Sequence, residues 1–165
     1  MRINIISIES SRPEWTQEAF NSYKTKFNKS IDVIWVGCKP AQRSKNYNIS
    51  AIVEKESALL LSKTKKEDLI VALDKEGSEV STEKLRLSFD NWVSSSRDIS
   101  FLIGGPDGLS RDLVRESDFC WSLSDLTFPL FFPTSFHISI RFFTNRRFTF
   151  RSRLASLFTF VNIFV

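Results

Sequence analysis

A glycine-rich segment is the strongest local indication of chemistry in this sequence. Residues 104–108 read Gly-Gly-Pro-Asp-Gly and follow the apolar run 100–103 directly. Glycine adopts positive φ angles at little cost and lets the backbone approach a ligand closely. A turn at the carboxyl end of a parallel strand often borders a ligand-binding crevice. A tight strand-to-helix turn explains the segment equally well, so both interpretations stay open at this point.

A second segment, residues 121–129, reads Trp-Ser-Leu-Ser-Asp-Leu-Thr-Phe-Pro. Its small hydroxyl side chains and its backbone provide many hydrogen-bond donors and acceptors. These groups suit the rim of a small-molecule pocket. An ordinary surface loop has the same composition and is the alternative.

Several other kinds of site are excluded or disfavoured. The chain has no GxxxxGK[ST] segment and no GxGxxG after its first strand, so it has neither a P-loop nor a dinucleotide fingerprint. Cys38 and Cys120 have no metal-ligand spacing, and the single histidine, His137, lies in an unusual tail, so we expect no metal site and no Ser/His/Asp triad. The cysteines favour reduced, partly buried thiols and a cytoplasmic location.

The net charge of +4 does not by itself indicate a nucleic-acid-binding body. Up to residue 125 the chain has 18 basic and 19 acidic residues, a net charge of −1. The remaining five basic residues are all arginines beyond residue 140. The basic excess therefore belongs to the tail alone.

Alternating strand and helix patterns would position the two segments. Short apolar runs predict five strands, at residues 2–8, 31–36, 69–73, 100–103 and 120–123. The continuous apolar run at 69–73 is typical of a central strand buried on both faces. Strands that alternate with helices predict an α/β sheet with right-handed crossovers.

Four helices are expected between these strands. Pro13 suits the first turn of a helix whose buried face would carry residues 15, 19, 23 and 27. Apolar positions in 49–60 and in 85–93 predict two more helices, the latter burying Leu85, Phe89, Trp92 and Val93. A fourth helix is expected at about 110–117, with Ser110 as its N-cap.

The chain beyond residue 130 differs from the rest. It carries 10 of the 16 phenylalanines and no lysine, acidic residue or glycine. We therefore divide the chain into a domain at 1–129 and a divergent Phe/Arg-rich tail at 130–165. Out-of-frame or disordered sequence is one interpretation of the tail, and a native Phe-rich segment is the other. No apolar stretch reaches the roughly 18 residues of a membrane helix, and we expect no membrane association.

Three segments together resemble the ribosomal RNA large subunit methyltransferase H family, which belongs to the SPOUT class. Residues 101–110 are similar to its (L/V)-I-G-G-P-x-G-L motif, and residues 121–129 to its S-L-S-x-(L/M)-T-(F/L)-P motif. Residues 69–74, with the following Gly77, resemble its strand ending in (T/A)-L-(D/E). The order and the spacing of the three also match, over about residues 1–129.

The resemblance implies a fold and a cofactor. The fold is a SPOUT-like knotted parallel sheet with helices on both faces. The cofactor is S-adenosylmethionine, held by the backbone of three loops. Carried over position by position, its contacts fall on Leu73, Gly104, Leu123, Ser124, Asp125, Leu126, Thr127 and Phe128.

The resemblance also implies the substrate and the partners. The family methylates N3 of a pseudouridine in a loop of large-subunit ribosomal RNA, so we expect the ribosome as a partner and a homodimer if the C-terminal region folds. Loop bases can be splayed out for recognition. A basic loop with Lys39, Arg43 and Lys45 is a candidate RNA contact, and a solvated surface loop is the alternative.

The sequence departs from the family after residue 129. The family continues with a helix carrying Glu-Gln-x-Tyr-Arg, which closes its knot and its dimer interface, and ends in Tyr-His near the acceptor base. Residues 130–165 contain none of these motifs, so the C-terminal helix is altered or missing and no catalytic residue is assigned. Three hypotheses follow: an active methyltransferase, an inactive remnant or variant that retains the cofactor cleft, and a cofactor-dependent module whose tail stacks on RNA.

Overall fold

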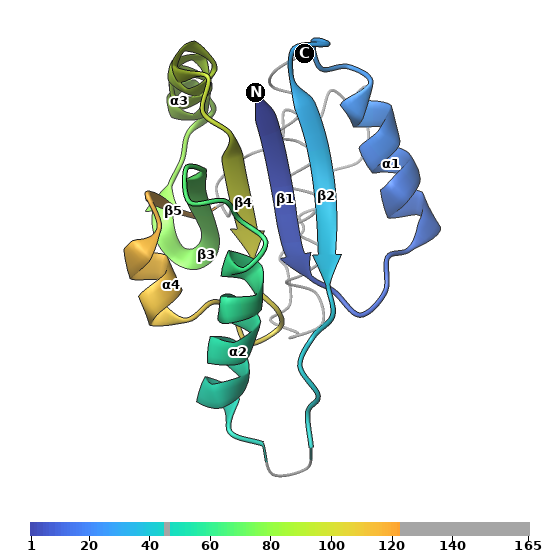
Figure 1. Ribbon diagram of the computed structural model, residues 1–165, viewed down its shortest axis with the longest axis vertical. Coiled ribbons are helices and arrows are strands. Elements are labelled where there is room, and N and C mark those ends of the chain that lie inside the picture. Colours follow the sequence, from blue (N-terminus) through green and yellow to red (C-terminus); the bar gives the residue numbers. More distant parts are fainter. Residues whose placement is uncertain (45–46, 123–165) are drawn as a thin grey trace, which may run out of the picture.

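The computed structural model describes residues 1–44 and 47–122, in which strands and helices alternate (Figure 1). The strands are β1 (Arg2–Ile8), β2 (Asp32–Cys38), β3 (Leu69–Glu79), β4 (Ile99–Ile103) and β5 (Phe119–Ser122). The helices are α1 (Glu14–Lys24), α2 (Ile49–Leu61), α3 (Thr82–Ser95) and α4 (Arg111–Glu116). The strands form one sheet in the order β2-β1-β4-β3-β5, and every pairing is parallel. The predicted α/β class is confirmed.

The sheet is covered on both faces because successive strand residues point to opposite sides. In β1, Ile3 and Ile5 join one apolar cluster, and Ile6 and Ile8 join a second. The first cluster includes side chains of α1 and α3, and the second includes side chains of α2 and α4. Helices α2 and α4 lie together in front of the sheet in Figure 1. This two-sided burial explains why β3 and β4 read as continuous apolar runs.

Helix α3 packs through an aromatic group centred on Trp92. The Trp92 ring stacks on Trp121 of β5 at 5.4 Å and meets Phe101 of β4 edge-on at 6.2 Å. Offset or edge-on aromatic pairs add to the free energy gained from burial alone. Leu85, Phe89 and Trp92 are buried as predicted, whereas Val93 is 41% exposed, so its predicted place on the buried face is wrong.

The predicted buried face of α1 is also wrong in part. Trp15 is 52% exposed, and the helix ends at Lys24, before Phe27. The residues fully buried in α1 are Thr16 and Phe20, while Ala19, Tyr23 and Phe27 are partly buried and pack against the first apolar cluster. An i+4 series drifts around a helix of 3.6 residues per turn, so its first residue, Trp15, does not lie on the face that meets the sheet.

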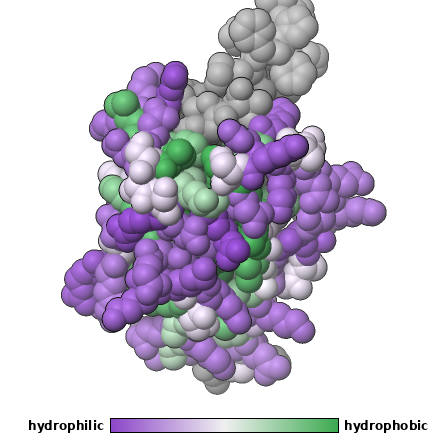
Figure 2. Space-filling view, turned by 45° about the horizontal axis from the view of Figure 1, so that its top comes forward, coloured by the Kyte–Doolittle hydropathy of each residue, from purple (hydrophilic) through white to green (hydrophobic). Residues whose placement is uncertain are grey.

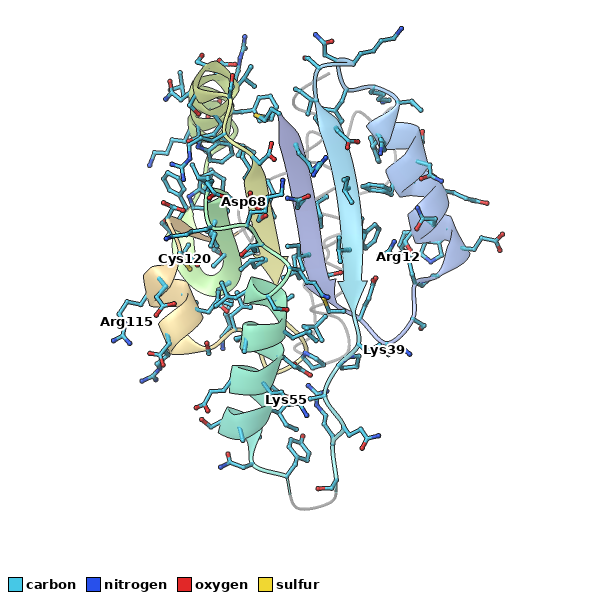
Figure 3. The ribbon with its side chains drawn as sticks, viewed as in Figure 1. Arg12, Lys39, Lys55, Asp68, Arg115 and Cys120 are labelled. Carbon is cyan, nitrogen blue, oxygen red and sulfur yellow. The ribbon has the colours of Figure 1, made fainter. Side chains whose placement is uncertain are left out.

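The amino edge of the sheet is closed by a buried carboxylate. Asp68, only 4% exposed, accepts hydrogen bonds from Ser100 Oγ at 2.6 Å and from the Lys65 backbone N–H at 3.1 Å (Figure 3). With the top of the molecule turned forward, the visible surface is mostly hydrophilic, with a smaller hydrophobic area in its upper part (Figure 2). In the described part of the chain, no helix combines the length and apolarity needed to cross a membrane.

Candidate functional site

The carboxyl ends of β3, β4 and β5 lie side by side. Leu73 of β3 is paired with Ile103, the last residue of β4, on one side and with Trp121 of β5 on the other, so the ends of β4 and β5 lie level with Leu73. Gly104 follows Ile103 directly and therefore lies next to the end of β3. The structure thus brings together two of the predicted cofactor contacts, Leu73 and Gly104. The predicted contacts at 123–128 lie outside the described residues.

The turn after β4 is compact because glycine occupies both of its ends. The Gly108 N–H donates to the Gly105 carbonyl oxygen at 3.1 Å, and Gly108 has a φ of +90°. A Cβ on Gly104 would lie 2.4 Å from the Gly108 carbonyl oxygen. No L side chain fits that space without moving the backbone. We call residues 104–108 the glycine turn.

Strand β3 folds back beside the glycine turn, and this was not predicted. The apolar run predicted a strand that ends at 73, but β3 continues to Glu79 through an irregularity between Leu73 and Ser78. Trp121 pairs with both of these residues, so the chain bulges between them. A Cβ on Gly77 would lie 2.6 Å from the Trp121 carbonyl carbon, and the missing side chain is what allows this close approach.

The bulge of β3 carries acidic groups toward the site. Asp74 Oδ2 lies 3.6 Å from the position that a Cβ on Gly108 would occupy, so this carboxylate faces the glycine turn. Asp74 Oδ1 also accepts a hydrogen bond from the Glu76 N–H at 3.0 Å. Burial, followed by the charges of Asp74 and Glu76, raises the pKa of the Cys120 thiol. The edge therefore combines backbone polar groups with a negative local potential.

The predicted RNA-contact residues lie near this edge, but one of them is already paired. Lys39 is exposed just beyond the end of β2 (Figure 3). The Arg43 guanidinium instead forms ion pairs with Glu56, at 3.3 Å, and with Asp107, at 3.1 Å. Partial burial acts to lower its pKa, but the bond to Asp107 and the charge of Glu56 outweigh burial and raise the pKa of Arg43. Lys45 lies outside the described residues.

Two acidic residues near the site escaped prediction from sequence. Glu56 is 1% exposed on α2, and Asp107 lies within the glycine turn. A signal for Glu56 was present, since it stands between Ile52 and Leu60 on the apolar stripe of the helix. A carboxylate on a buried stripe requires a partner, because an unpaired buried charge is strongly unfavourable. No pattern in the sequence identified Asp107 as one end of that pairing.

A parallel sheet with a glycine turn and an acidic bulge at its carboxyl edge is typical of α/β domains that bind small molecules there. The family model described as predicted SPOUT methyltransferase matches residues 1–132. The match covers most of the chain, and the chain belongs to this family. The resemblance inferred from three short segments is thereby confirmed.

Two curated relatives are similar over most of the chain. Ribosomal RNA large subunit methyltransferase H of Methylobacillus flagellatus is 38% identical over 129 residues, which cover 78% of this chain and 83% of the relative. The protein of the same name from Thioalkalivibrio sulfidiphilus is 36% identical over 129 residues, with the same two shares covered. The similarity thus spans the sheet, the glycine turn and the bulge of β3.

Proposed function

We propose that this chain is an S-adenosylmethionine-dependent methyltransferase acting on N3 of a pseudouridine in large-subunit ribosomal RNA. The observation that carries the proposal is the register of Leu73 with Ile103, which brings the end of β3 against the glycine turn. Family membership and the names of the two relatives support the same reaction class. Trp121 and Ser122, the first two residues of the second sequence motif, belong to β5, which pairs with β3.

The chemistry of the edge suits this cofactor. An adenosyl group needs apolar surroundings with backbone donors and acceptors at their rim, and apolar Leu73 and Ile103 lie beside the backbone of the glycine turn. Asp74 faces the glycine turn, where a carboxylate favours a positively charged ligand. When bound, S-adenosylmethionine supplies an electrophilic methyl carbon on a cationic sulfur. The task of Leu73 and Gly104 is then to hold that carbon in line with the acceptor, because orientation provides much of the rate.

The RNA assignment rests on the relatives and on the exposed loop after β2. Both relatives are named for a ribosomal RNA substrate. Lys39 is exposed at the carboxyl edge of the sheet, where its ammonium group can meet phosphate. Arg43 is held by two carboxylates, so we assign it to the structure of the site before any RNA contact.

Further properties follow from the same assignment and are part of the proposal. They are a trefoil knot, a homodimer, a cytoplasmic location and a division of the chain at residue 129. The knot and the dimer need a C-terminal helix, and residues 130–165 lack the family motif for it. An inactive remnant that binds S-adenosylmethionine without transferring its methyl group is therefore the second candidate.

Calorimetric titration with S-adenosylmethionine tests the cleft, and transfer of a labelled methyl group to ribosomes lacking the modification tests the reaction. We expect Gly104→Ala to abolish cofactor binding, because its Cβ would meet the Gly108 carbonyl oxygen at 2.4 Å. Gly37→Ala is the matched control, since it lies in the edge strand β2 and its Cβ would meet the end of the Glu9 side chain, which pairs with Arg12, and no backbone atom of the glycine turn.

The two readouts separate the candidates. Binding together with transfer to a pseudouridine N3 supports the enzyme. Binding without transfer supports the remnant, and reading the gene in its other two frames beyond codon 129 would show whether the missing helix is encoded there. Absence of binding in the unaltered protein contradicts both.

A further inference from the structure

An ion-pair network joins three separate segments at the carboxyl edge of the sheet. Arg43 lies in the loop after β2, Glu56 lies in α2, and Asp107 lies in the glycine turn. The Arg43 Nη1 group is 3.3 Å from Glu56 Oε1, and its Nη2 group is 3.1 Å from Asp107 Oδ2. The Arg43 Nε–H also donates to Asp107 Oδ2, at 3.4 Å. One guanidinium therefore bridges two carboxylates from different elements.

Glu56 is the buried centre of this network. Its side chain is 2% exposed, compared with 25% for Arg43 and 18% for Asp107. Besides Arg43, Glu56 Oε1 accepts a hydrogen bond from the Ala41 backbone N–H at 2.9 Å. The network thus fixes the loop after β2 through both a side chain and the backbone. Burying a carboxylate without such partners would be strongly unfavourable.

Glu56 also packs directly against the glycine turn. A Cβ on Gly105 would lie 2.6 Å from Glu56 Oε2, so glycine at this position lets the carboxylate lie against the backbone. The next residue of α2, Ser57, accepts a hydrogen bond on Oγ from the Ser110 N–H at 2.9 Å. Helix α2 therefore contacts the turn at Gly105 and just beyond its end at Ser110.

We infer that Arg43, Glu56 and Asp107 are positioning residues, which set the backbone of the glycine turn for the methyl donor and couple it to the loop after β2. This inference rests on the proposed function for the identity of the ligand. Asp107 is part of the turn, and Glu56 packs against the turn at Gly105. Arg43 forms ion pairs with both carboxylates and so connects them. A change in any of the three shifts the Gly104 backbone without removing a group that touches the cofactor.

The coupling has a direction that can be measured. A ligand that needs the glycine turn in one conformation stabilises the bridge, and through it the loop that contains Ala41. The reverse also holds, because coupling between two sites is reciprocal. Binding at the turn should therefore slow hydrogen exchange of the Ala41 N–H, which donates to Glu56 at 2.9 Å.

The test compares Arg43→Ala, Arg43→Lys and Asp107→Asn in the full chain with the unaltered protein. Titration with S-adenosylmethionine gives the dissociation constant, and amide NMR signals of Gly104, Gly105 and Gly108 report the turn. Lys24→Gln is the control, because it removes an exposed ion pair with Asp32 at the amino edge of the sheet. If Arg43→Ala does not fold, the same measurements are made on Asp107→Asn, which keeps an acceptor oxygen.

We expect Arg43→Ala and Asp107→Asn to shift the glycine signals and to weaken binding roughly tenfold, within the usual range for coupled sites. Arg43→Lys should recover only part of the affinity, since an ammonium group cannot reproduce the planar bridge between two carboxylates. If all variants bind S-adenosylmethionine with equal affinity, or if Lys24→Gln loses as much affinity as the Arg43 and Asp107 variants, the inference is overturned while the proposed function stands. If the unaltered protein does not bind the cofactor, the proposed function fails, and unchanged glycine signals in Arg43→Ala overturn the inference separately.

Discussion

The two thiols of the chain have environments that suppress their reactivity. Cys38 is buried at the end of β2, where burial raises its pKa, the charge of Lys63 lowers it, and the charge of Glu9 raises it. Burial and the acidic bulge raise the pKa of Cys120. Since the thiolate is the nucleophile, both residues stay protonated at a pH where an ordinary thiol begins to ionise. This agrees with the reduced, free cysteines found in the structure.

We therefore predict slow alkylation by iodoacetamide at pH 7.5 in the folded protein, compared with the same protein in guanidinium chloride. The folded state holds its thiol protons more tightly than the unfolded state, so this contribution to stability is complete below the ordinary thiol pKa of 9.0 and is lost as pH rises from there through the raised pKa of the folded state. Denaturant titrations at pH 8 and pH 10 would measure the loss. The variants Cys38→Ser and Cys120→Ser show which thiol causes the loss of stability. Alkylation of the folded protein as fast as that of the unfolded chain would contradict the prediction.

Single residues show what the sequence could and could not reveal about the site. Leu73 and Gly104 were predicted as cofactor contacts because their segments match motifs with a fixed order. Asp107 was missed because its partner, Arg43, is 64 positions away, and such a pairing leaves no local pattern in one sequence. The position of Glu56 on the apolar stripe of α2 indicated a buried carboxylate but not its partner. The prediction that Arg43 contacts RNA could not include these ion pairs, because a basic loop looks alike in sequence whether its charge is free or paired.

At the scale of elements, local patterns predicted the features of strands and helices that depend on a single local interaction. The N-cap at Ser110 is confirmed, because its side chain accepts a hydrogen bond from the Leu113 N–H at 3.2 Å. The extension of β3 was missed, since residues 74–79 are polar and contain a glycine. Their place in the sheet depends on pairing with β5, and no strand propensity encodes that pairing.

The fold of β3 against β5 leads to a prediction about Gly77. We expect Gly77→Ala to destabilise the protein by about 1–3 kcal/mol, the usual cost when a tight contact is overpacked. The new Cβ would meet the Trp121 backbone carbonyl carbon at 2.6 Å and its nitrogen at 2.7 Å, and neither can move without breaking the strand pairing. Urea unfolding followed by tryptophan fluorescence measures the change in free energy of unfolding.

Ser78→Ala is the control for that experiment. It removes only the exposed hydrogen bond from Ser78 Oγ to the Cys120 carbonyl oxygen at 3.1 Å, so we expect a loss of no more than about 1 kcal/mol. If Gly77→Ala were as stable as the unaltered protein, the close approach between β3 and β5 would be wrong.

At the scale of the whole molecule, the strand order creates the site. Residues 73 and 104 are far apart in sequence, and β3 and β4 become neighbours only in the order β2-β1-β4-β3-β5. Periodicity predicted that strands and helices alternate but not which strands pair. The resemblance to a family predicted only that three segments meet at one cofactor, and it did not give the strand order. The carboxyl edge of the sheet therefore includes the bulge of β3 and the ion pairs that connect the loop after β2, helix α2 and the glycine turn.

If this edge binds the methyl donor, the ligand must stabilise the whole fold through it. Binding to the native state alone adds about 2.7 kcal/mol to the free energy of unfolding when the free ligand is present at 100 times its dissociation constant. We therefore predict that S-adenosylmethionine raises the urea midpoint of the unaltered protein in a concentration-dependent way. Gly104→Ala should show no such increase, since its Cβ would displace the Gly108 carbonyl oxygen and with it the turn. An equal increase in both proteins would mean that the ligand binds elsewhere, and the site at the ends of β3 and β4 would have to be abandoned.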